Sequence, residues 1–100
     1  MRTIAITLLV LAGGCGAREF DSLGTFARAQ DEAGFVILGT FGTIQWPATV
    51  VEEREQKNEI SFKTPDGTPH RYPGYDGFTL KVLRLKGRDG AEIVFVLRSK

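Results

Sequence analysis

Cysteine, histidine and tryptophan occur only once each in this chain of 100 residues. A single cysteine excludes a disulfide within the chain, and one cysteine with one histidine cannot supply the three or four nitrogen and sulfur ligands of a zinc site. Charge of neither sign is in excess, because 13 Lys and Arg face 12 Asp and Glu. A balanced charge predicts no broad electrostatic attraction to nucleic acid. We therefore expect no metal site and no nucleic-acid partner.

Long apolar runs are also scarce, and the most informative one lies at residues 4–11. It follows Arg2 and precedes three small residues at 12–14. A positive start, a short apolar run and a small-residue cleavage zone are the parts of a secretory signal peptide. The run is too short for the roughly 20 apolar residues that a membrane-spanning helix needs. We expect residues 1–14 to be a signal peptide that is removed on export.

The tetrapeptide Ala12-Gly13-Gly14-Cys15 resembles the lipobox of bacterial lipoproteins. The resemblance implies that Cys15 becomes the first residue of the mature chain, carries a diacylglycerol thioether and has an acylated amino group. Several acyl chains together anchor a protein stably to a membrane. Gly16 instead of Asp after the cysteine implies delivery to the outer membrane, with the protein on its periplasmic face. The alternative is an ordinary secretory leader cut after Ala17, which gives a diffusible protein.

Residues 15–100 are enough for one small domain and too few for two. We expect residues 15–20 to be a lipidated tether and residues 21–100 to fold as a single small β-rich domain. A helix is predicted over residues 22–33, with Asp21 or Ser22 as its N-cap and Gly34 as its C-terminal stop. Its predicted inner face carries Leu23, Phe26, Ala27 and Gln30. This face packs on the domain's own sheet or, alternatively, docks a partner helix.

From residue 35 onwards the pattern is typical of strands. We expect short strands at 35–38 and 41–46, and a half-buried hairpin that pairs residues 49–55 with 59–64. Residues 78–85 and 91–98 are joined by a short turn and should pair antiparallel, with a bulge where the alternation changes at Leu83. The predicted fold is α+β: one short N-terminal helix followed by a five- or six-stranded antiparallel curled sheet or small open barrel.

The residues with most potential for chemistry lie in the segment 68–77, which we interpret as a binding loop. His70, Arg71, Tyr72 and Tyr75 offer amphipathic contact area on a segment stiffened by two prolines. The alternative is a structured connection whose tyrosines pack over the edge of the sheet. Trp46 is a further candidate, either as an exposed anchor for a peptide or glycan or as part of the core.

Catalytic patterns are weak throughout the chain. Ser61 and His70 with Asp66 or Asp76 lack the strand-to-helix nucleophile elbow of a serine hydrolase. The glycines at 39–42 lack the lysine and following helix of a phosphate-binding loop. The acidic residues at 52–59 alternate with basic ones and lack a calcium-binding loop, so a solvated, salt-bridged hairpin tip is the favoured interpretation. We expect no catalytic activity and no cofactor.

Two functional hypotheses from different classes follow. The first is a small lipid-anchored envelope lipoprotein that acts as a non-catalytic binding or structural module for another envelope component. The membrane is then one partner, through Cys15, and an envelope protein is the other. The second is a small periplasmic or surface inhibitor of an envelope or foreign hydrolase. A protruding, ordered segment from His70 to Tyr75 favours the inhibitor, whereas an exposed edge strand favours the binding module.

Overall fold

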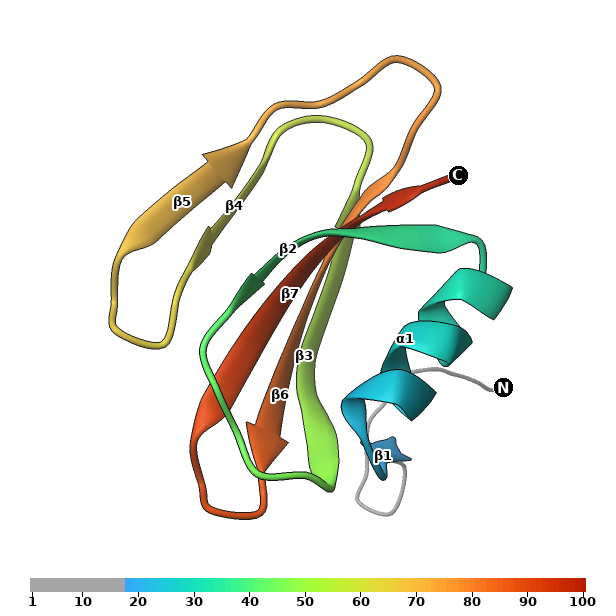
Figure 1. Cartoon of the computed structure of the whole chain (residues 1–100). Helices are drawn as coiled ribbons and strands as arrows, with labels where there is room; N and C mark the ends of the chain where they lie inside the picture. The colour runs from blue at the N-terminus through green and yellow to red at the C-terminus, as the bar shows by residue number, and fades with distance from the viewer. Residues whose placement is uncertain (1–17) are drawn as a thin grey trace, which may run out of the picture.

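One helix and seven strands are formed by residues 18–100, the residues that this computed structural model describes. Five strands make one antiparallel sheet in the order β1-β3-β6-β7-β2, and two others make a separate hairpin (Figure 1). The elements are β1 (Glu19–Phe20), α1 (Leu23–Glu32), β2 (Phe35–Phe41), β3 (Ala48–Gln56), β4 (Ile60–Lys63), β5 (Pro69–Tyr72), β6 (Leu80–Gly87) and β7 (Glu92–Ser99). The signal peptide, the lipobox and Cys15 predicted from the sequence lie outside the described residues. Within residues 18–100, no helix has the length and apolar character required to cross a membrane.

The centre of the sheet is the antiparallel pair β6 and β7, which is buried on both faces. Residues 93–97 of β7 are all buried and apolar, as are Leu80, Val82, Leu83 and Leu85 of β6. Such a strand needs a cover on each side. Helix α1 covers one face and the hairpin of β4 and β5 covers the other (Figure 1). We call these the helix side and the hairpin side.

Helix α1 confirms the prediction for residues 22–33. Ser22 is the N-cap, and its Oγ accepts a hydrogen bond of 3.1 Å from the Thr25 amide. Gly34 follows the helix with a φ of +92°, a left-handed conformation that glycine adopts at low cost. Phe26 is fully buried on the domain's own sheet, whereas Leu23 stays half exposed. The inner face of the helix is therefore occupied within the chain.

Phe26 is the centre of the core on the helix side. Its ring lies 4.3 Å from the Phe95 ring, 5.1 Å from the Phe20 ring and 6.2 Å from the Trp46 ring. The other buried residues of this core are Ile44, Ala48, Leu83, Leu85, Ile93 and Leu97. The core on the hairpin side is smaller and consists of Ile60, Phe62, Leu80, Val82, Val94 and Val96.

The structure confirms an α+β fold with one short helix and an antiparallel sheet, but the predicted curled sheet or small open barrel is wrong. Strands β1 and β2 lie at opposite edges, and no pairing among residues 18–100 joins them. The reason is that each face of β6 and β7 is covered by a separate element. Helix α1 contacts both edge strands, so it covers the helix side without closure of the sheet.

Three predictions about the strands are also wrong. Strand β3 pairs with β1 and β6, whereas β4 pairs with β5, so residues 49–55 and 59–64 do not form a hairpin. Residues 42–46 are not a strand. The predicted bulge at Leu83 in β6 is absent from the register, and the register shifts instead at Leu38 in β2 and at Val51 in β3, which have no partner residue. The changed alternation in β6 instead reflects burial on both faces, which requires apolar residues at consecutive positions.

Candidate functional site

The structure places three of the predicted site residues on one strand, β5. His70 and Tyr72 are half-buried on its inner face, and Arg71 is exposed on its outer face. The predicted binding loop therefore begins later than expected, because residues 69–72 pair with β4. Pairing of His70 with Phe62 and of Tyr72 with Ile60 places their rings above the hairpin-side core.

The His70 ring belongs to an aromatic cluster between the hairpin and the end of β2. It stacks on the Phe62 ring with centroids 5.5 Å apart and an interplanar angle of 12°. The Phe41 ring of β2 lies 4.7 Å from His70 on another side. Tyr72 also stacks on Phe62, at 5.9 Å. These contacts fix the His70 ring in one orientation relative to two separate strands.

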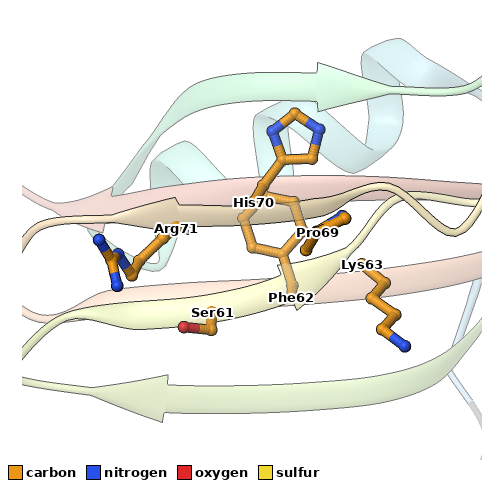
Figure 2. Close-up of a pocket in the computed structure, with 6 residues that line it drawn as sticks. All are labelled: Ser61, Phe62, Lys63, Pro69, His70 and Arg71. Atoms are coloured by element: carbon orange, nitrogen blue, oxygen red, sulfur yellow. The ribbon is translucent and has the colours of Figure 1, made fainter.

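Two hollows meet at His70. The first, which we call the outer hollow, has a volume of about 610 Å³ and lies on the solvent side of the hairpin (Figure 2). Figure 2 shows the side chains of Lys63 and Arg71 extending away from the stacked rings of Phe62 and His70. Arg71 is paired with Glu59 at 3.3 Å, and both groups are largely exposed. The outer hollow is lined by Ser61, Phe62, Lys63, Pro69, His70 and Arg71.

The second hollow, which we call the turn hollow, has a volume of about 500 Å³ and separates the β4–β5 turn from the end of β2. One carboxylate, that of Asp66, lines this hollow. Its Oδ1 accepts hydrogen bonds from the Thr64 hydroxyl and from the Thr68 amide. The Thr64 hydrogen bond, with help from Thr68, lowers the pKa of Asp66 from 3.8 to about 2. The lining residues are Thr40, Phe41, Gly42, Thr64, Pro65, Asp66, Thr68 and His70.

Two arginines fasten the other edge of the hairpin to the sheet. Arg54 of β3 donates to the Ser61 carbonyl at 2.6 Å, and Arg84 of β6 donates to the Lys63 carbonyl at 2.9 Å. These donors satisfy carbonyls of β4 that have no strand beside them. The sequence offered no clear signal for this role, because the edge of β4 that both arginines reach was predicted to pair with residues 49–55.

Glu52 neutralises both arginines. Its carboxylate accepts from Arg54 at 2.8 Å and from Arg84 at 3.1 Å, and Glu92 lies 3.3 Å from Arg84. Burial by itself raises the pKa of Glu52, but the hydrogen bonds from Arg84 and Arg54 outweigh it, and the pKa is lowered. This carboxylate therefore belongs to an ion-pair network. Within residues 18–100, no three His, Cys, Asp or Glu side chains form a group that could hold a metal ion.

The remaining sequence candidates lie away from His70. Tyr75 is about half exposed in the connection after β5, beside a smaller hollow of about 290 Å³ that Lys57 and Asp76 also line. Trp46 is half-buried against the core on the helix side, on the opposite face of the sheet. The structure thus brings His70, Arg71 and Tyr72 together and separates them from Tyr75 and Trp46. Phe41, Phe62 and Asp66, which complete the two hollows, were not among the predicted site residues.

Comparison of the chain with protein-family models, with curated proteins and with solved structures finds no match.

Proposed function

We propose that this protein is a small envelope lipoprotein, anchored through Cys15 to the periplasmic face of the outer membrane, that binds an envelope protein without catalysis. The binding site that we assign is the hairpin surface, defined as Ser61, Lys63, Pro69, His70 and Arg71. The observation that carries the proposal is the meeting of two hollows at a His70 ring that is held by Phe41 and Phe62.

Rigidity supports binding at this surface. The hairpin surface rests on a paired strand backbone and on buried aromatic rings. A preorganised surface loses little conformational entropy when a partner binds, and arginine is enriched among the residues that dominate binding energy. Strand β5 pairs only with β4 among the described residues, so its outer edge has backbone groups available for an extended partner segment.

The position of the hairpin is compatible with a lipid anchor. Residues 19–20 at the end of the predicted tether form strand β1, which pairs with β3. Strand β1 lies on the helix side of the molecule, and the hairpin lies on the opposite side (Figure 1). An anchor at Cys15 therefore leaves the hairpin surface free to face a partner. The inhibitor hypothesis is less favoured, because residues 69–72 pair with β4 as a strand instead of forming a protruding loop.

The test combines a mass measurement with site-specific crosslinking in a Gram-negative host. We expect a membrane-bound product that begins at Cys15 and carries acyl groups, and an unmodified product from the Cys15→Ser variant. A photo-crosslinking residue at position 71 should then give a discrete protein adduct. The matched control is the same residue at position 28, because Arg28 is an exposed arginine of α1 on the opposite side.

Two results would contradict the proposal. A soluble, unacylated product that begins after Ala17 would remove the anchor and favour a diffusible inhibitor. Equal adducts from positions 71 and 28, or none from position 71, would remove the hairpin surface as the binding site.

A further inference from the structure

We propose that the turn hollow binds an arginine side chain presented by the partner protein. This inference rests on the proposed function, because it names the chemistry by which the hairpin side recognises that partner. It uses the second hollow and Asp66, neither of which is part of the hairpin surface defined above.

The charge of the turn hollow selects a cation. Asp66 is the only Asp, Glu, Lys or Arg in its lining. Asp66 forms no ion pair with a basic side chain of residues 18–100. Its Oδ1 accepts from the Thr64 hydroxyl and from the Thr68 amide, so the carboxylate is held in place in an exposed turn. An ionised carboxylate has about four acceptor sites, so this exposed group can also accept from an incoming N–H donor.

The aromatic part of the hollow selects a planar cation. The rings of Phe41 and His70 lie with centroids 4.7 Å apart and form part of the lining. A guanidinium can stack on an aromatic face and donate in its own plane to a carboxylate at the same time. An ammonium group is compact and strongly hydrated, and it cannot stack. Arginine therefore fits this combination better than lysine.

The shape of the hollow is maintained from two sides. A Cβ added at Gly42, whose φ is +107°, would lie 2.7 Å from the Glu92 carbonyl oxygen and 3.2 Å from Cγ of Pro65. The β4–β5 turn therefore lies close to the end of β2, and Pro65 and Gly42 both line the hollow. Gly67 adopts a φ of +89° in the same turn, which orients the amide of Thr68 toward Asp66.

The probe for the test is Nα-acetyl-arginine methylamide, titrated into the full 100-residue chain in mild detergent and followed by two-dimensional amide NMR. We expect saturable shift changes confined to residues 40–42 and 64–70. Nα-acetyl-citrulline methylamide, which has nearly the same shape without the charge, should not produce them. The Asp66→Asn variant keeps the acceptor oxygen for Thr64 and Thr68, and its affinity for the arginine probe should fall about tenfold.

The matched control variant is Asp89→Asn. Asp89 accepts a hydrogen bond from the Ala91 amide in another turn, as Asp66 does from Thr68, but it lines neither hollow that meets at His70. Its affinity for the probe should equal that of the native chain. The dispersion of the amide spectrum shows in each case that the variant is folded.

The inference is overturned if no residue of the turn hollow shifts, if the citrulline probe binds equally well, or if Asp66→Asn binds like the native chain. These failures are distinguishable from failure of the proposed function. If the arginine probe causes no shift changes while position 71 still gives a crosslinked adduct, the arginine site alone is rejected. A normal arginine response without that adduct rejects the hairpin surface as the partner-binding site.

Discussion

Eight buried apolar residues, Phe26 among them, form the core on the helix side of the sheet, whereas six form the core on the hairpin side. Arginines make further connections on the hairpin side. On the helix side the contacts of Phe26 are with other large aromatic rings. On the hairpin side, Arg54 and Arg84 reach carbonyls of β4 across the gap between the two sheets.

This difference explains why a hollow separates the β4–β5 turn from the end of β2 on the hairpin side. Side chains that interdigitate exclude space between layers, and protein cores approach the density of organic crystals. Long arginine side chains can join two layers at their edges without filling the space between them. The hairpin side therefore has fewer buried apolar residues to stabilise it and has concave surface that a partner can use.

The largest expected effect is on the helix side. Phe26→Ala should lower the free energy of unfolding by about 4 to 5 kcal/mol, because a fully buried ring in contact with three other rings is lost. Phe62→Ala removes a similar ring from the hairpin side and should cost about 3 kcal/mol. Urea denaturation of both variants measures the difference. A larger cost for Phe62→Ala would show that the hairpin side, and not the helix side, is the main core.

Loss of an arginine from the hairpin side should have the next largest effect. Arg84→Met leaves the Lys63 carbonyl without its donor and Glu52 and Glu92 without a shared cation, at a cost of about 2 kcal/mol. Amide hydrogen exchange should quicken in β4 and β5 more than in α1. Lys86→Met on the same strand is the control, since Lys86 is exposed. If the exchange rate rises equally in all elements of the Arg84→Met variant, Arg84 does not stabilise the hairpin locally.

A smaller effect is expected where β5 approaches β2. A Cβ at Gly39 would lie 2.7 Å from the Tyr72 hydroxyl oxygen and 3.2 Å from Val96 Cγ1, so Gly39→Ala should cost about 1 to 2 kcal/mol. Removal of the hydroxyl in Tyr72→Phe should recover part of this cost. A double-mutant cycle by urea denaturation measures the coupling. Additive costs would mean that the hydroxyl is not the group that excludes a methyl at Gly39.

The smallest effect is a dependence of stability on acid. The pKa values of Glu52 and Asp66, both on the hairpin side, are lowered in the folded protein, that of Asp66 from 3.8 to about 2. A depressed carboxyl pKa contributes stability that is present above the unfolded value and is lost as pH falls through the folded value. The urea midpoint of the native chain should therefore fall between about pH 5 and about pH 2 more than that of Asp66→Asn. Parallel curves for the two proteins would contradict the shift at Asp66.

Much of the fold follows from local patterns. The helix at 22–33 was predicted because Ser22, Phe26 and Gly34 each have a local role: N-cap, buried face and C-terminal stop. The antiparallel pair β6 and β7 was predictable because a short turn joins two long strands. The doubly apolar run of β7 is typical of a strand covered on both faces.

Strand pairing beyond neighbours was not predictable in the same way. Strands β3 and β4 are consecutive and separated by a few residues, yet each finds its partner elsewhere. The local alternation of Ile60 and Phe62 shows which face is buried and does not show which strand lies alongside. Pairing depends on the total apolar area that the chain can bury, a property of the whole fold.

The candidate site shows the same limit. His70, Arg71 and Tyr72 were found because their residue types are suited to binding, but Phe41 and Asp66 come to His70 from separate parts of the chain. No spacing in the sequence indicates that Phe41, at the end of an edge strand, lies against the ring of a residue 29 positions later.

The sequence by itself determined the helix and its caps, the central β6–β7 pair and the α+β class, because capping, turn geometry and hydrophobic periodicity act between near neighbours. The tertiary structure alone decided that the sheet stays open, that β4 and β5 leave β3 to cover the second face, and that two hollows meet at His70. These features depend on contacts between residues distant in sequence, which no local pattern of residues specifies.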